Sequence, residues 1–338
     1  MPTLYVNYLS KLPHVSQIIT GFHYLGKEQE YDIILANKTK KPADAPELPA
    51  AVELLYRNKK IIYDLDDGYQ HLDGMRYLLC DCDYYFKRSY SDEKNAALLA
   101  EFSDKIFPLG FNYHVSYEGN PINQDPPAGI KQMIKKLIGF KSASYFTPEV
   151  FEKKSPKKNS TPRILFYTRL WPSKENEYIN TMRIEIIRIL RKKFGKAFSG
   201  GIQYSLLARS LCPDLILPPN KTNKSAYLKK LHDSDICIGS MGLHESIGWK
   251  TGEYVAASKA IVNEKLRYSV PGNFAEGKNY LSFESAEECI QAIERLMSDP
   301  ELLEAMKANN HAYYNAFLKP DVLVRNTLRA VDSLIGEE

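Results

Sequence analysis

Residues 236–262, ICIGSMGLHESIGWKTGEYVAASKAIV, determine the predicted fold of this chain. The apolar run at 236–241 predicts a buried strand, and a glycine-containing loop follows it. A helix is expected over 251–259, and a second apolar run at 260–265 predicts another strand. Strand, helix and strand in this order are typical of a βαβ unit, so the segment predicts parallel strands in an α/β sheet.

Two carboxylates in this segment are candidates for ligand binding. Glu245 lies in the loop and Glu253 on the helix, with seven residues between them and Gly248 three residues after the first. The free N–H groups of the first helical turn and the helix dipole favour an anion, and glycine permits close backbone approach. Glu253 could then accept hydrogen bonds from ribose hydroxyls beside a diphosphate. The alternative is that Glu245 only caps the helix and Glu253 is a surface acid.

The strand predicted at 163–170 carries two cations at its carboxyl end. Arg169 ends the strand and Lys174 follows five residues later. Open α/β sheets bind ligands at this edge, and an arginine fork with a lysine charge suits phosphate oxygens. A solvated pair of loop cations is the alternative. The pattern continues with helices at 175–197, 224–235, 285–299 and 300–317, and with a strand at 214–219.

These motifs together resemble glycosyltransferase family 4. Arg-x4-Lys after the first strand, and Glu-x7-Glu with glycine three after the first Glu, occur here in the family's order. The resemblance covers about 163–317 and implies a retaining, nucleotide-sugar-dependent enzyme of the GT-B fold. It implies that Arg169 and Lys174 neutralise the leaving diphosphate, that Glu253 binds ribose and that Glu245 contacts the donor sugar. Further donor-side residues are His244 in the loop, Ser246, Ile247 and Gly248 through backbone N–H groups, and Pro219 and Asn220 near the base.

The first half of the chain has a weaker α/β pattern. Strands are expected at 4–9, 32–37, 60–67, 84–90 and 105–110, with helices after Pro13 and at 46–58 and 91–104. A polar, basic stretch at 151–162 is the predicted linker. The sequence therefore predicts two Rossmann-like α/β/α domains, which the GT-B resemblance places across a cleft. They span 1–155 on the acceptor side and 160–317 on the donor side, and a helix at 318–338 is expected to pack back on the first domain.

Polar side chains at predicted strand ends of the first half are candidates for the acceptor side. They are Asp67, Lys87, Arg88 and His114. Asp64 and Asp66 form an Asp-x-Asp pair, which allows a metal-dependent transferase as an alternative. Aspartate is also common in turns. The leading hypothesis has no metal and no cofactor, with a sugar nucleotide of the UDP or GDP type as co-substrate.

Composition and charge exclude several classes of protein. The 338 residues are 44% hydrophobic and 25% charged, as in globular proteins, and the net charge of +4 does not indicate nucleic-acid binding. Five scattered cysteines without a CxxC pair predict free thiols. No apolar run long enough to cross a membrane and no secretory signal is visible, so a cytoplasmic address is expected. The basic segment 131–158 carries eight lysines and could contact anionic lipid at the inner membrane face, or be a solvated linker.

The sequence thus predicts a glycosyltransferase that moves a sugar from a nucleoside diphosphate to a glycan or lipid-linked glycan acceptor. Synthesis of surface polysaccharide or another glycoconjugate is the expected setting. A non-catalytic protein of the same fold that binds a sugar nucleotide or serves as a scaffold is the alternative from a different functional class.

Overall fold

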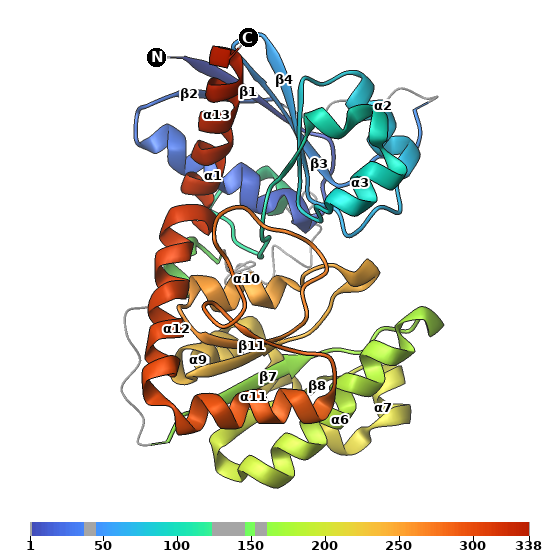
Figure 1. Cartoon of the computed structure of the whole chain (residues 1–338), viewed down its shortest axis with the longest axis vertical. Helices are drawn as coiled ribbons and strands as arrows, with labels where there is room; N and C mark the ends of the chain where they lie inside the picture. Colours follow the sequence, from blue (N-terminus) through green and yellow to red (C-terminus); the bar gives the residue numbers. More distant parts are fainter. Residues whose placement is uncertain (1, 37–44, 124–145, 153–160, 338) are drawn as a thin grey trace, which may run out of the picture. The chain divides into compact units, whose positions relative to one another are not determined.

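Two six-stranded sheets form the framework of the protein, and a computed structural model describes it over residues 2–36, 45–123, 146–152 and 161–337. The chain divides into unit 1, Met1–Pro148 with Lys319–Glu338, and unit 2, Glu149–Leu318. Helices alternate with strands in both units (Figure 1). The predicted class of two Rossmann-like α/β units is confirmed.

Unit 1 has the strand order β2-β1-β3-β4-β5-β6. All neighbouring pairs are parallel except those made by β3, which is antiparallel to both β1 and β4. The elements of this unit are β1 (Thr3–Tyr8), α1 (Ser16–Lys27), β2 (Asp32–Ala36), β3 (Ala51–Tyr56), β4 (Lys59–Asp64), α2 (Leu72–Cys80), β5 (Tyr84–Lys87), α3 (Asp92–Leu98), β6 (Ile106–Pro108) and α13 (Pro320–Glu337).

The prediction of a helix at 46–58 is wrong, because this segment contains the strand β3. Tyr56 pairs with Lys59, so only Arg57 and Asn58 form the turn to β4. Both turn residues have a left-handed backbone, with φ of 49° and 60°. Such a two-residue turn matches the twist of an antiparallel hairpin. The short apolar run fits a helix or a strand equally well, and pairing with the neighbouring strands decides between them.

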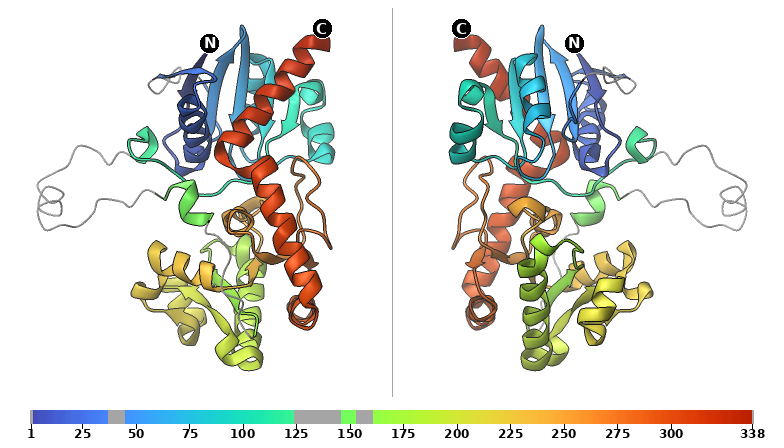
Figure 2. Two further views of the ribbon diagram at one scale, coloured as in Figure 1. Left: turned by 90° about the vertical axis from the view of Figure 1, so that its left-hand side faces the viewer. Right: turned by 90° about the vertical axis from the view of Figure 1, so that its right-hand side faces the viewer.

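The last helix, α13, completes the core of unit 1. Its apolar side chains, among them Val324 and Leu328, are fully buried together with residues of α1 and of the sheet. Two tyrosines fasten it to the sheet: Tyr63 shares a 2.7 Å hydrogen bond with Thr327, and Tyr56 donates to Asp332 over 3.0 Å. The helix lies over the sheet of unit 1 in one view of Figure 2 and behind it in the other.

Unit 2 has an entirely parallel sheet with the order β12-β11-β10-β7-β8-β9. This is the doubly wound order, and its reversal point lies between β7 and β10, where such sheets bind ligands. α9 and α10 cover one face, and α6, α7 and α11 cover the other (Figure 1). The elements are β7 (Ile164–Thr168), α6 (Glu177–Phe194), β8 (Phe198–Gln203), α7 (Leu206–Leu211), β9 (Ile216–Leu217), α8 (Pro219–Thr222), α9 (Lys224–Asp233), β10 (Ile236–Gly239), α10 (Trp249–Ala256), β11 (Ala260–Glu264), β12 (Leu281–Phe283), α11 (Ala286–Ser298) and α12 (Pro300–Tyr313), and α5 (Pro148–Phe151) crosses the boundary between the units.

The predictions for the basic segment and for the linker concern parts of the chain that lie largely outside the described residues. Most of the basic segment 131–158 and of the linker 151–162 lies outside the described residues. Among the described helices, none combines the length and the apolar character that crossing a bilayer requires.

Candidate functional site

The loop after β10 presents Glu245 from a strained backbone. His244 and Glu245 have φ of 53° and 61°, a region that residues other than glycine rarely adopt. Hydrogen bonds hold the loop in this form: Gly242 N donates to Ser246 O over 2.7 Å, and the Tyr268 hydroxyl donates to His244 O over 2.9 Å. Strain of this kind costs about 1–3 kcal/mol per residue and is typical of functional sites.

The start of α10 comes very close to the end of β10. A side chain at Gly248 would place its Cβ only 2.7 Å from Ser240 O, so only glycine fits at the residue that precedes the helix. The prediction that the Ser246 N–H group faces a phosphate does not fit this structure. Ser246 is buried, and its N–H already donates to Leu243 O over 3.0 Å. Ile247, between them, is buried as well.

Glu253 is a buried, ionised carboxylate on the next turn of α10. Its residue is 4% exposed, and Oε1 accepts a hydrogen bond from the ammonium of Lys224 on α9. Burial alone would raise the pKa of Glu253, but the charges of Lys224 and Lys250 outweigh it and lower that pKa. Within the described residues, Glu253 Oε2 and the hydroxyls of Tyr227 and Tyr254 are buried without a hydrogen bond of ordinary geometry. These three groups are neighbours, because the Tyr227 hydroxyl interacts with the Glu253 carboxylate and with the Tyr254 hydroxyl.

Arg169 lies at the carboxyl end of β7 and is exposed. Its guanidinium is 3.9 Å from the ring centroid of Trp171, a cation–π contact that orients it. Arg183 of α6 fixes the backbone here, since it donates to Arg169 O over 2.6 Å, to Ser240 Oγ over 3.0 Å and to Met241 O over 2.7 Å. Burial lowers the pKa of Arg183 to about 10, which keeps it charged at neutral pH. The loops after β7 and β10 are therefore tied together by one buried cation.

Other predicted donor-side residues are exposed. Lys174 begins the short 3-10 helix Lys174–Asn176 after β7. Pro219 and Asn220 begin α8, directly before α9, which carries Lys224. Sequence reasoning missed both Lys224 and Lys250. Lys250 lies within the predicted Gly248–Glu253 motif, whereas Lys224 precedes Glu253 by 29 residues and meets it only in the folded chain.

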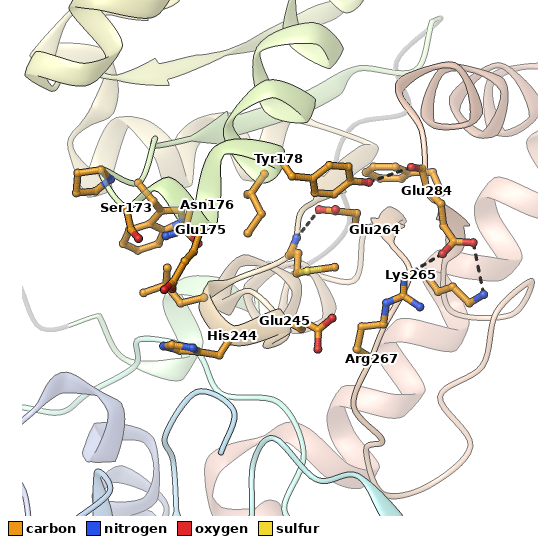
Figure 3. A pocket seen from close by; sticks show the side chains of 16 residues that line it. Ser173, Glu175, Asn176, Tyr178, His244, Glu245, Glu264, Lys265, Arg267 and Glu284 are labelled. Carbon is orange, nitrogen blue, oxygen red and sulfur yellow. Dashed lines mark hydrogen bonds and ion pairs between the residues drawn. The ribbon is translucent and has the colours of Figure 1, made fainter. Parts of the chain in front are cut away.

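A cavity of about 750 Å³ lies at the ends of β7, β10, β11 and β12. Among its lining residues are Trp171, Tyr178, His244, Glu245, Glu264 and Arg267 (Figure 3). Glu264 is 3% exposed; its Oε2 accepts from Met241 N over 2.7 Å, while Oε1 has no partner among the described residues. Burial raises the pKa of this carboxyl group. A cavity with aromatic walls and unsatisfied polar atoms is suited to a hydroxylated ligand such as a sugar ring.

In unit 1, Asp64 and Lys87 form a buried ion pair. Both side chains have no exposed surface, and Lys87 Nζ lies 2.8 Å from Asp64 Oδ2, which also accepts from the Tyr85 hydroxyl over 2.8 Å. Lys87 therefore offers no surface to an acceptor in this structure, contrary to expectation. Asp64 is likewise unavailable to a metal ion, and the described residues contain no group of three His, Cys, Asp or Glu side chains placed to hold one. Asp66 is next to His71, with 3.3 Å between Oδ2 and Nε2, and burial raises the pKa of Asp66.

The remaining predicted acceptor-side residues come together. Arg88 is 3% exposed and donates to the carboxylate of Asp67. His14, which follows β1 closely, lies near both and near His114. Burial lowers the pKa of His14, Arg88 and His114 lower it further, and Asp67 opposes them. His14 was missed from the sequence, where its position directly after Pro13 in the segment between β1 and α1 was the available signal.

Comparisons with known proteins find likeness in solved structures only. No family model matches, and no curated protein matches. The C-terminal domain of the glycosyl transferase group 1 family protein LpcC from Francisella tularensis aligns with 50% of this chain and 96% of its own, at 15% identity and a TM-score of 0.35. TarM of S. aureus, in a complex with UDP, aligns with 76% of this chain at 13% identity and a TM-score of 0.45, and this chain spans 46% of TarM.

A putative UDP-N-acetylglucosamine 2-epimerase from Listeria monocytogenes aligns over 98% of this chain and 96% of its own, again at 13% identity and a TM-score of 0.45. All three of these likenesses have TM-scores below 0.5 and identities of 13–15%.

Proposed function

We propose that the protein is a glycosyltransferase that uses a nucleoside-diphosphate sugar as donor. The observation that carries this proposal is the state of Glu253 on α10, which is buried and held ionised by the charges of Lys224 on α9 and Lys250. It lies at the reversal point of a doubly wound sheet, where nucleotides bind. In the proposed complex, a ribose hydroxyl donates to the Glu253 carboxylate.

The chemistry follows from the charges around this point. A departing nucleoside diphosphate develops negative charge, which Arg169 and the positive end of the α10 helix dipole stabilise. Glu245 projects into the cavity described above, whose walls fit a sugar ring. The proposed reaction retains the anomeric configuration, needs no metal, and transfers the sugar to a glycan or lipid-linked glycan in glycoconjugate synthesis. In unit 1, Asp67, Arg88, His14 and His114 are the proposed acceptor-side residues.

Nucleotide binding is the first test. UDP or GDP at millimolar concentration should raise the melting temperature, and Arg169→Ala or Glu253→Ala should remove the increase. Arg188→Ala is the matched control, because Arg188 is an exposed arginine of α6 whose pair with Asp214 is exposed too. No increase with any nucleoside diphosphate would refute the proposal. An increase that survives Glu253→Ala would refute the assigned site.

Turnover is the second test. A panel of UDP- and GDP-sugars with a sugar-alcohol acceptor, followed by NMR, would show transfer and the anomeric configuration of the product. Loss of activity in EDTA would contradict the metal-independent mechanism. Nucleotide binding without turnover would favour the non-catalytic alternative, and a change in the free sugar nucleotide itself would indicate epimerisation.

A further inference from the structure

Glu264 is a buried carboxylate with one oxygen that has no partner. It ends β11, is 3% exposed and lines the cavity at the carboxyl edge of the unit 2 sheet (Figure 3). Its Oε2 accepts a hydrogen bond from Met241 N over 2.7 Å, whereas its Oε1 accepts none among the described residues. A buried carboxylate oxygen without a donor is costly, so a ligand that donates to Oε1 would be bound favourably.

A second buried polar atom of the same cavity also has no partner. The indole Nε1 of Trp171, in the loop after β7, is a donor without an acceptor in the described part of the chain. The residue itself is held firmly: Trp171 N donates to Asn180 Oδ1 over 2.9 Å, and Asn180 Nδ2 donates to Trp171 O over 2.8 Å. The cavity therefore offers one acceptor and one donor to a ligand that carries both functions.

The charges around Glu264 favour a neutral group on the ligand. Two cations act on its carboxylate, Arg183 of α6 and Arg267 after β11. A ligand ammonium group would be repelled by these two guanidinium groups, and a ligand carboxylate, as in a uronic acid, by Glu264 itself. Lys265 and Arg267 are in turn paired with Glu284, at 3.5 Å and 3.0 Å. The remaining donors are a hydroxyl group and an amide N–H.

Apolar walls decide between these two donors. Besides the polar groups, the cavity is lined by Ile179 of α6, by Met241 and Leu243 after β10, and by Phe283 of β12. A hydroxyl group has no apolar surface to bury against them. An acetamido group has an N–H that donates, a carbonyl oxygen that accepts and a methyl group that is apolar. The cavity volume of about 750 Å³ is sufficient for a sugar ring with this substituent.

We propose that the donor sugar is an N-acetylhexosamine, whose amide N–H donates to Glu264 Oε1 and whose amide carbonyl accepts from Trp171 Nε1. This assignment rests on the proposed function and adds to it the class of sugar that is transferred. Glu264 then has two tasks, because one oxygen holds the backbone of the loop after β10 and the other selects the substrate. Glu264 and Trp171 are specificity-determining residues of the reaction.

The test is calorimetric titration of the full chain with UDP, UDP-N-acetylglucosamine, UDP-N-acetylgalactosamine, UDP-glucose and UDP-galactose. The wild type should bind one of the acetamido sugars about 10- to 100-fold more tightly than the hexose of the same configuration, as a hydrogen bond to a charged group contributes. If only GDP binds, GDP-N-acetylglucosamine and GDP-glucose take the place of the UDP-sugars.

Two variants test the assigned contacts. Glu264→Gln keeps an oxygen for Met241 N but replaces Oε1 by an NH₂ group, which cannot accept from an amide N–H. It should abolish the preference for the acetamido sugar and leave the affinity for UDP unchanged. Trp171→Phe keeps an aromatic ring, removes the indole N–H and should reduce the preference about threefold to tenfold. Glu185→Gln, at an exposed glutamate of α6, is the matched control and should behave like the wild type.

The outcomes separate the two proposals. Wild-type protein that binds neither UDP nor GDP refutes the proposed function and this assignment with it. Wild-type protein that binds the nucleoside diphosphate but does not prefer the acetamido sugar refutes this assignment alone. A preference that is unchanged in Glu264→Gln and in Trp171→Phe refutes the assigned contacts and leaves Oε1 to a bound water molecule. If Glu264→Gln does not fold, the preference of Trp171→Phe decides.

Discussion

Replacing Lys87 by methionine should destabilise unit 1 by about 3–5 kcal/mol, because it leaves a buried carboxylate without its counterion. Asp64 has no exposed surface and accepts hydrogen bonds from Lys87 Nζ and the Tyr85 hydroxyl, each over 2.8 Å, and from Asp66 N over 2.9 Å. Methionine matches the length of the lysine stem but removes the charge. For a unit of this size the loss corresponds to a fall in melting temperature of about 6–20 °C.

Two optical probes can assign the loss to unit 1. Both tryptophans, Trp171 and Trp249, lie in unit 2, so their fluorescence follows unit 2, whereas far-UV circular dichroism follows both. In urea, Lys87→Met should lower the denaturant concentration at which the unit 1 part of the dichroism signal is lost. The fluorescence transition, which reports on unit 2, should stay where it is in the wild type. The double variant Lys87→Met/Asp64→Asn should recover most of the stability, since it removes the uncompensated charge as well.

Lys60→Met is the matched control. Lys60 also pairs with an aspartate, Asp81, over 2.6 Å, but the two side chains are 32% and 71% exposed, so this loss should cost less than about 1 kcal/mol. Equal effects of Lys60→Met and Lys87→Met would refute the argument from burial. A Lys87→Met variant with unchanged stability and reduced turnover would instead support the prediction that Lys87 is an acceptor-side residue.

Three further predictions concern backbone strain, packing and titration. Glu245→Gly should raise the free energy of unfolding by about 1 kcal/mol, because glycine accepts a φ of 61° without strain, and it should abolish sugar transfer. Urea denaturation measures the first effect and a turnover assay the second. Unchanged stability would contradict the argument from backbone strain. Gly21→Ala should lower the free energy of unfolding by about 2 kcal/mol or more, since the alanine Cβ would lie 2.3 Å from Pro320 O. Thermal melting measures this loss. An unaltered melting temperature would show that α13 can shift. The free energy of unfolding should rise between pH 8 and pH 10 more in the wild type than in Lys250→Met. The folded-state pKa of about 8 lies below the ordinary value near 10.5, so the unfolded chain binds more protons there; parallel pH profiles would contradict this.

The fold of unit 2 was predictable where the signal is local. The runs at 236–241 and 260–265 are continuous and apolar, and each ends at a polar or glycine-containing loop, so β10, α10 and β11 were all anticipated. β8 was missed because its sequence, FSGGIQ, contains two adjacent glycines and little apolar character. Pairing with β7 and β9 on both sides makes it a strand, and no local pattern reports such pairing.

In the candidate site, too, the residues with a local sequence signal were predicted and those that depend on contacts in the folded chain were not. Glu245, Glu253 and Arg169 follow from spacing around strands and a helix, because the carboxyl ends of parallel strands meet at one edge. The partner of Glu253 is Lys224, from another helix, and no spacing relates the two. The burial of Lys87 was equally invisible, since Lys87 and Arg88 are adjacent cations in the sequence. The alternation of a strand sends one to Asp64 in the interior and the other to Asp67.

Helix α10 differs from neighbouring helices of unit 2 in the way it begins. α7, α9 and α11 start with a side chain that accepts a backbone hydrogen bond, namely Ser205, Asn223 and Ser285. α10 starts with Gly248, which has no side chain to accept one, and places Lys250 where an acid would be stabilising. Both choices reduce the stability of the free helix, and the left-handed loop before it adds strain. α6 and α8 also begin without such a hydrogen bond, so α10 is set apart by Lys250 in its first turn and by the left-handed backbone of the loop before it. Departures from local rules that gather at one point are typical of functional sites, and this point lies at the carboxyl end of β10.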